Sequence, residues 1–461
     1  MCDTMIALGD VTASGRVIFG KNSDREPNEA QYLTQQAAAD HAPGSMVECT
    51  YIAIPQAAHT YAVLGSRPWW MWGFEHGMNE KGLTIGNEAV WSRLPASDAP
   101  GLLGMDLLRL TLERAADADE AIAVLTDLLE TYGQSGNASA SRTMLYHNSF
   151  ILADGTGGWV LQTAGKHWAE KRIRSWASIS NVYSIADDYD RISAHAINSA
   201  TAEGWYDPAS GQAFNFATAY ADLGLPKIQA CQARFAMSQA GLGQLAKRGG
   251  IEIQEVFNLL RTHGAGDDDS DWRPGEDGDS TLCMHAKDAA GFETAASLVT
   301  ELPRLGEDRP LVYWASLASP CLSAFVPVWF DDGAPAAFEQ PALGLADAWW
   351  DQEKLQRAVE RDYAAYSGMV RSVYGRLERE ALAAVSALPA GTTSAERQAL
   401  TAQFAARQDA ARRALRTALD ALAAGPLPPR PDLRGTYLAD LHAEIPNAAR
   451  HRAPLVCVSA A

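Results

Sequence analysis

The residue best suited to nucleophilic chemistry stands second in the chain. The sequence begins Met1-Cys2-Asp3-Thr4-Met5, and a small residue after methionine normally permits removal of that methionine. We therefore expect a chain that begins at Cys2 and carries a free thiol and a free α-amino group on one residue. Thiolate is the nucleophilic form of cysteine, and an α-amine has a pKa of roughly 7.7–8.0. The amine is thus suited to act as general base for its own side chain. In the alternative interpretation, Cys2 only follows the start codon.

A run of polar residues is expected to lie beside Cys2. Residues 4–9 and 16–20 are predicted strands, and the turn signal at 13–15 joins them into a hairpin. Such a hairpin brings the end of its second strand next to the start of the first. That end is the run Lys21-Asn22-Ser23-Asp24-Arg25.

The elements that must position these residues are strands and helices in separate blocks. Further strands are predicted at 49–54, 61–64, 83–87, 149–153, 159–163 and 176–178. Residues 105–132 are predicted to be helical, with Asp117 as the N-cap of a second helix and Gly133 after its end. Strands, then two helices, then strands again indicate sheets covered by helices.

The C-terminal part of the chain differs in composition. From about residue 343 it is rich in Ala, Arg and Glu, and apolar residues from Leu355 to Leu377 have the spacing of an amphipathic helix. Residues 388–393 interrupt this pattern, and Ser394 is the predicted cap of a second helix. We predict a main domain over 2–342, a helical hairpin over 343–425 and a Pro-rich arm over 426–461. The hairpin is expected to be structural or to form a homo-oligomer.

Composition excludes several classes of protein. The 461 residues include 56 acidic and 38 basic ones, which gives a formal net charge of −18 and excludes general binding to nucleic acid. No stretch reaches the roughly 18 apolar residues of a membrane span, and no secretory signal is recognisable. We therefore expect no membrane partner and a cytoplasmic location. Six cysteines without CxxC spacing predict neither a disulfide framework nor a zinc knuckle.

Candidate metal ligands are present but do not form a convincing pattern. Asp267, Asp269 and Asp271 have the spacing of a calcium loop, but Trp272 stands where its glycine belongs, so a solvated surface loop is favoured. Cys283-Met284-His285 is too small a group for a metal site. We predict no metal and no cofactor, and we interpret the other five cysteines, with His147 and His285, as structural.

Several short motifs occur in a characteristic order along the chain. They are Cys2-Asp3-Thr4, 20–25, Ser66-Arg67-Pro68-Trp69, 77–83, 86–91, 146–150, 163–166, 179–181 and 294–299. Together they resemble the secernin and dipeptidase A family of cysteine-type N-terminal-nucleophile hydrolases, closest to the secernin-like branch. The resemblance implies an α+β fold, the four-layer αββα sandwich, in which the nucleophile begins one of two antiparallel sheets. The predicted helical hairpin would be appended to it.

The resemblance also implies roles for individual residues. Cys2 matches the nucleophile, Asp24 the acid that orients its amine, and Asn87 the amide that stabilises an oxyanion. Asn181 matches a second asparagine near the amine, and Arg234 is placed like a remote arginine of related cysteine amidases. Three further residues are assigned to substrate binding: Lys21, which stands where those amidases carry Arg, Arg25, and Trp69, which is either core or pocket wall.

The function implied is hydrolysis of a C–N amide bond in a dipeptide or a small N-acyl amide, through an acyl-enzyme. Two alternatives stay open. One is a non-hydrolytic protein of the same fold that acts through partner binding, and the other is an acyltransferase that passes the acyl group to an amine.

Overall fold

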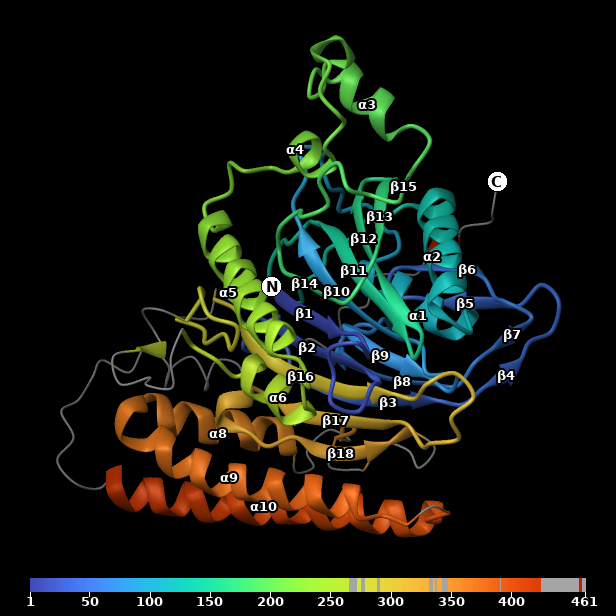
Figure 1. The fold of residues 1–461 in the computed structure, drawn as a ribbon. Helices are drawn as coiled ribbons and strands as arrows, with labels where there is room; N and C mark the ends of the chain where they lie inside the picture. Colours follow the sequence, from blue (N-terminus) through green and yellow to red (C-terminus); the bar gives the residue numbers. More distant parts are fainter. Residues whose placement is uncertain are drawn as a thin grey trace.

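The central part of the molecule is a pair of antiparallel sheets. The computed structural model describes residues 1–264, 272–274, 278–287, 291–330, 335, 338–341, 347–389, 391–423 and 456–457. The first sheet has six strands in the order β14-β1-β2-β16-β17-β18 (Figure 1). Their bounds are β1 Cys2–Ala7, β2 Val17–Arg25, β14 Trp176–Ile179, β16 Glu293–Leu302, β17 Val312–Leu317 and β18 Val326–Trp329.

The second sheet has eight strands in the order β15-β13-β12-β11-β10-β9-β8-β3. They are β3 Gln31–Gln36, β8 Val63–Pro68, β9 His76–Asn79, β10 Thr84–Val90, β11 His147–Asp154, β12 Gly157–Ala164, β13 His167–Arg172 and β15 Arg191–Ile192. Two small sheets lie outside it. One contains β5 (Met46–Glu48), β6 (Ile52–Pro55) and β19 (Val456–Cys457), and the other contains β4 (Ala39–Asp40) and β7 (His59–Thr60).

Helices cover the outer face of each sheet. The pair α5 (Ile228–Arg248) and α6 (Ile253–Leu260) packs on β14, β1, β2 and β16, while α1 (Gly104–Arg114) and α2 (Ala118–Tyr132) pack on β9 to β12. Shorter helices are α3 (Ala196–Ala202), η1 (Pro208–Ser210), α4 (Phe216–Tyr220) and η2 (Pro320–Leu322). The four layers form the predicted αββα sandwich, which confirms the fold class.

Strand periodicity explains why both faces of the sheets are apolar. Along β11, Ile151 and Ala153 belong to the main core, whereas Phe150 and Leu152 belong to the cluster under α1 and α2. Successive side chains of a strand point to opposite faces, so a strand between two apolar layers must be apolar throughout. The helix boundary predicted at Asp117 is present, since its side chain accepts a 2.8 Å hydrogen bond from the Glu120 amide.

The first two strands form the predicted hairpin, with one difference. In the antiparallel register, Cys2 lies opposite Ser23 and Asp3 opposite Asn22. The polar run 21–25 is part of β2 itself and is buried, instead of following the strand. Pairing with β16 on the other side explains the extension, because this partner continues the ladder to Arg25.

The C-terminal helices lie against the six-stranded sheet and not apart from it. The structure has α8 (Ala348–Glu360), α9 (Tyr363–Ser386) and α10 (Ser394–Ala423), which lie together at the bottom of Figure 1. The first predicted helix is thus two helices, because Asp362 interrupts it and caps α9 by accepting from the Ala365 amide. The buried Trp349 indole donates to the Ala295 carbonyl at 2.7 Å.

Two predicted features fall largely outside the described residues. The Pro-rich arm over 426–461 does so apart from Val456 and Cys457, and so do Asp267, Asp269 and Asp271 of the acidic loop. The division into domains at 342 and 425 stays a prediction. Among the helices of the described ranges, none combines the length and apolar character that crossing a membrane requires.

Candidate active site

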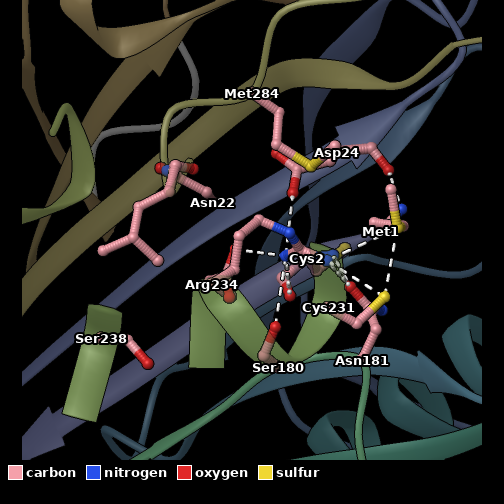
Figure 2. Close-up of polar contacts among 12 residues, drawn as sticks. Met1, Cys2, Asn22, Asp24, Ser180, Asn181, Cys231, Arg234, Ser238 and Met284 are labelled. Carbon is pink, nitrogen blue, oxygen red and sulfur yellow. Dashed lines mark hydrogen bonds and ion pairs between the residues drawn. The ribbon is translucent and has the colours of Figure 1, made fainter. Parts of the chain in front are cut away.

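Cys2 begins β1, which lies between β14 and β2 in the six-stranded sheet, and is buried, at 4% exposed. Its backbone nitrogen donates to Asn181 Oδ1 at 2.9 Å (Figure 2). Its sulfur lies 3.7 Å from Glu75 Oε2. Both the nitrogen and the sulfur of one residue therefore face polar partners in a protein interior.

Asn181 is held so that its carbonyl oxygen faces Cys2. It follows β14, the strand paired with β1, and its Nδ2 donates to the Ala89 carbonyl at 2.7 Å. Its Oδ1 also accepts from Arg234 Nη2 at 2.7 Å. A carbonyl can only accept and a guanidinium can only donate, so these two partners determine the orientation of the amide.

Arg234 projects from α5 and is fully buried among groups that accept hydrogen bonds. Its Nη1 contacts Asp3 Oδ2 at 2.6 Å, Ser180 Oγ at 3.2 Å and the Cys2 carbonyl at 3.4 Å. Burial alone would lower the pKa of this guanidinium, but the negative charge of Asp3 outweighs it and raises the pKa. Arg234 is thus a charged anchor that positions Asn181 and the start of β1.

Asp24 lies on β2 beside the N-terminus. Its backbone exchanges two hydrogen bonds with Met1, since the Met1 nitrogen donates to the Asp24 carbonyl at 2.7 Å and the Asp24 amide to the Met1 carbonyl at 2.8 Å. Its Oδ1 accepts from Thr294 Oγ1 at 2.7 Å. Burial raises the pKa of this carboxyl to about 6, against the opposing influence of the N-terminal charge.

Lys21 is buried between the two sheets. Its Nζ donates to the Asn87 carbonyl at 2.7 Å and lies 3.6 Å from Glu88 Oε1. A β-carbon on Gly86 would lie 2.5 Å from Lys21 Cδ, so glycine at this position leaves room for the lysine. Burial opposes the charge, but the Cys2 thiol, Glu88 and Glu75 together raise the pKa of Lys21, so it stays positive beside Cys2.

The Asn87 side chain lies on the face of the second sheet that α1 covers, the face of its cross-strand neighbour Phe150. Its Nδ2 donates to Asn148 Oδ1 at 2.9 Å and contacts Met105 Sδ at 3.4 Å. Asn148 donates in turn to Gln134, whose own Nε2 donates to the Gly165 carbonyl. These hydrogen bonds determine the orientation of all three side-chain amides. One Asn87 N–H is therefore committed to Asn148, while the other meets a sulfur, which is a weak acceptor.

The two remaining candidates differ in their distance from the nucleophile. Arg25 contacts Glu75 Oε1 at 3.2 Å and Glu29, so it reaches Cys2 through Glu75. Trp69 donates its indole N–H to the Asn28 carbonyl at 3.1 Å and packs against the main core. In the described part of the chain, no polar contact joins Trp69 to Cys2.

Glu75 is the residue that sequence reasoning missed. It lies just before β9, and its Oε2 accepts from the Cys2 thiol at 3.7 Å. The signal in the sequence was a charged residue, followed by His76, inside the otherwise apolar stretch 69–78. Burial, together with the charges of Glu75 and Asp24, raises the pKa of the Cys2 thiol to about 11 against the influence of Lys21. With Met1 attached, the thiol is therefore protonated near neutral pH.

The Met1 side chain occupies an apolar place beside Cys2. It packs with Cys231 and Met284, and the partly buried Trp91, Val182 and Phe292 adjoin them. A pocket of about 200 Å³ lies next to this place, shares Trp91 and Val182 with it, and is also lined by Asn181. The remaining lining residues are Tyr183, Ala221, Asp222, Leu223, Leu225, Ile228, Gln232 and Phe235.

Comparison with known proteins gives one family and several structures with a similar fold. A conjugated bile acid hydrolase from Clostridium perfringens, a C2A mutant, is 14% identical at a TM-score of 0.38, over 68% of this chain and 88% of that chain. Penicillin V acylase from Agrobacterium tumefaciens is 14% identical at a TM-score of 0.39, over 71% and 85%. An N-acylethanolamine-hydrolyzing acid amidase ortholog from Caenorhabditis elegans is 12% identical at 0.33, over 65% and 92%. The model of peptidase family C69 matches residues 48–375, more than two thirds of the sequence, and the chain therefore belongs to peptidase family C69, the family of dipeptidase A and secernin.

Proposed function

We propose that this chain hydrolyses the amide bond of dipeptides or small N-acyl amides, with Cys2 as nucleophile after cleavage of the Met1–Cys2 bond. Membership of peptidase family C69 supports amide-bond hydrolysis. The observation that carries the finer assignment is the hydrogen bond from the Cys2 nitrogen to Asn181, whose amide is oriented by the buried Arg234. A cysteine that only began a buried strand would not need charged groups arranged around its nitrogen.

Cleavage would turn the Cys2 amide nitrogen into an α-amine with little change of place. Asn181 Oδ1, now 2.9 Å from that nitrogen, would accept one N–H and orient the lone pair toward the thiol. Asp24 Oδ2 is buried and receives no hydrogen bond within the described residues. It would provide a second acceptor when the amine is charged, because a carboxylate is a strong partner for ammonium.

The chemical steps then follow from the two groups of Cys2. The thiol proton moves to the amine, and the thiolate attacks the substrate carbonyl carbon. As the C–N bond breaks, the leaving nitrogen takes a proton from the Cys2 ammonium, which leaves a thioester. Water gives a proton to the amine, attacks the thioester and releases the acid and the free thiol. Lys21 remains positive and favours the thiolate throughout.

The site must also supply a hydrogen-bond donor that stabilises the oxyanion. The second N–H of Asn87 Nδ2 now meets the Met105 sulfur, a poor acceptor that an oxyanion would replace. We assign this N–H to the oxyanion, in keeping with the role that the family resemblance implies for Asn87.

The apolar place of Met1 would receive the acyl part of the substrate. Once Met1 leaves, the space between Cys231 and Met284 joins the adjoining pocket of about 200 Å³. Its walls are mostly apolar and aromatic, which suits a hydrophobic acyl group or amino-acid side chain. Asp222 adds one carboxylate, which suits the α-ammonium of a dipeptide.

The test is turnover by a chain that begins at Cys2, measured on matched panels of dipeptides and N-acyl amides. Cys2→Ala should abolish turnover and leave the circular dichroism and the urea unfolding midpoint unchanged. Cys49→Ala is the matched control, because Cys49 is also buried but packs in the cluster under α1 and α2. Turnover by Cys2→Ala would end the proposal, as would a processed chain that neither turns over any substrate nor forms an acyl adduct at Cys2. Added amine acceptors separate hydrolysis from acyl transfer by the product formed.

A further inference from the structure

A second group of reactive side chains lies outside the site of Cys2, and the chemistry above uses none of them. The group consists of four residues that are each between 0% and 5% exposed: His263, Cys283, His285 and Cys321. Their potential ligand atoms, one from each residue, all lie within 4.8 Å of one another. His263 follows α6, Cys283 and His285 come from the segment 278–287, and Cys321 lies in η2. Distant parts of the sequence thus converge on one buried point.

The separations fit a tetrahedral metal centre. His285 Nε2 lies 3.2 Å from Cys321 Sγ and 3.6 Å from Cys283 Sγ. With Zn–S near 2.3 Å and Zn–N near 2.0–2.1 Å, two such ligands of one tetrahedral zinc are about 3.6 Å apart. Both measured separations agree with that value within a few tenths of an ångström. The remaining pairs of ligand atoms lie no more than 4.8 Å apart, so the four side chains need to move only slightly closer together to bind an ion.

The surroundings orient His285 as a ligand. Its Nδ1 lies 2.6 Å from Glu360 Oε1 on α8. A carboxylate at this distance accepts a hydrogen bond from Nδ1–H. The proton therefore stays on Nδ1, and the Nε2 lone pair faces the two sulfurs. Histidines that bind zinc commonly have such a carboxylate behind them. Glu360 is itself held by Arg357 Nη1 at 2.8 Å, so this second layer is also fixed.

Aromatic rings close the group from water. Trp272 stacks on the His263 ring with a centroid separation of 3.7 Å and an interplanar angle of 2°. Tyr363 stands edge-on to Trp272 at 4.8 Å, and its hydroxyl lies 3.4 Å from His263 Nδ1. Four protein ligands in a closed surrounding are typical of a structural zinc site, whereas a catalytic one keeps a position open.

We propose that His263, Cys283, His285 and Cys321 bind one zinc ion in a structural Cys2His2 site. Two thiolates and two imidazoles select zinc or another thiophilic divalent ion over calcium or magnesium. The proposal departs from our expectation that the chain has no metal site and that these two cysteines are ordinary apolar residues. In the sequence, only Cys283 and His285 are neighbours, and the other two ligands are supplied by the fold.

The zinc would fix a segment that also reaches the nucleophile. Met284 lies between two of the ligands and packs against Met1, so the segment presents its ligands and Met284 to different surroundings. The Met284 amide donates to Thr294 Oγ1 at 3.0 Å, and that hydroxyl donates to Asp24 at 2.7 Å. The site would therefore position Met284 beside Met1, would position Asp24, and would tie α8 to the sheets.

The first test is the metal content of the full chain, expressed without an affinity tag and purified in reductant. We expect one equivalent of zinc by elemental analysis. Replacement by Co²⁺ should produce the visible bands of a tetrahedral ion and the near-ultraviolet band of thiolate-to-cobalt charge transfer. The double variant Cys283→Ala/Cys321→Ala should lose the zinc, and the control Cys49→Ala should keep it.

A readout on the wild-type chain keeps the test decisive if the double variant does not fold. A strong chelator should make Cys283 and Cys321 reactive toward an alkylating reagent, and added zinc should protect them again. The proposal is overturned by a native chain that holds only traces of metal and gives no tetrahedral Co²⁺ spectrum. A Cys283–Cys321 disulfide in the native protein, detected by peptide mass spectrometry without reductant, would also overturn it.

Discussion

Cleavage of the Met1–Cys2 bond should change the reactivity of the Cys2 thiol by an amount that follows from its surroundings. The perturbation is a pair of preparations of the same chain, one that retains Met1 and one released from a cleavable fusion so that it begins at Cys2. With Met1 attached, burial and the nearby carboxylates raise the pKa of the thiol to about 11. At pH 7, such a pKa leaves about one thiol in 10,000 as thiolate.

In the processed chain, a positive α-ammonium stands on Cys2 itself and favours the thiolate. A fall of the pKa only to the ordinary value of about 8.5 would make about 3% of the thiol ionised, roughly 300-fold more. A less basic thiolate is a weaker nucleophile, and a Brønsted coefficient of about 0.45 over 2.5 units reduces the gain by about 13-fold. We therefore expect reaction with a disulfide reagent to be about 20-fold faster in the processed chain.

The assay is the rate of mixed-disulfide formation at pH 7, followed for each cysteine peptide by mass spectrometry. Cys49 is an internal control, because it lies in the cluster under α1 and α2 and should react equally slowly in both preparations. Removal of Met1 also opens a path to the sulfur, so the rate is measured against pH to obtain the pKa of Cys2 directly. An equal pKa in both preparations would refute the assignment of the α-amine as the activating group.

Three further predictions concern the surrounding residues. Arg234→Met should lower the free energy of unfolding by about 3–5 kcal/mol, because it leaves Asp3 charged and unpaired in the interior; an unchanged denaturation midpoint would contradict this. The Asp24 pKa of about 6 lies above its ordinary 3.8, so the folded chain binds this proton more tightly than the unfolded one. Wild-type stability should therefore rise relative to Asp24→Asn as the pH falls from about 6 to about 4, by at most about 1.4 kcal/mol per pH unit in parallel denaturations. A difference that is flat or of the opposite sign excludes the raised pKa. Asp222→Asn should raise KM for dipeptides but not for N-acyl amides, and equal effects on both would remove Asp222 as a partner of the α-ammonium.

The fold class was predictable because local signals agree with it. The Ala13-Ser14-Gly15 turn between two apolar stretches is enough to predict the β1–β2 hairpin. Asp117 is likewise enough to predict where α2 starts. The burial of 21–25 within β2 was not predictable. It depends on pairing with β16, more than 250 residues away, which no local pattern reveals.

Site residues that belong to a sequence motif were predictable. Residues that only tertiary packing places in the site were not. Cys2, Asn181 and Arg234 lie in one hydrogen-bonded group, and Asp24 lies 4.0 Å from Arg234 as an ion pair, although their catalytic roles stay predictions. Glu75 was missed because its proximity to the sulfur follows from how the second sheet lies over the first, so only tertiary structure reveals it. The same reason hides His263 and Cys321 from any search for ligand spacing.

The geometry around the Cys2 nitrogen explains how one cleavage could activate the site without rebuilding it. Asn181 Oδ1 is an acceptor for an amide N–H and for an amine N–H alike, and hydrogen bonds with Ala89 and Arg234 hold the Asn181 amide in place. Asp3 and Arg234 are fully buried, and the ion pair between them does not involve Met1. Cleavage therefore moves the α-ammonium from Met1 onto Cys2 itself and places a base beside the thiol, while the Met1 side chain leaves an apolar place next to it. Because the charge and the space appear in a single step, an unprocessed chain should lack both the activated nucleophile and the room for its substrate.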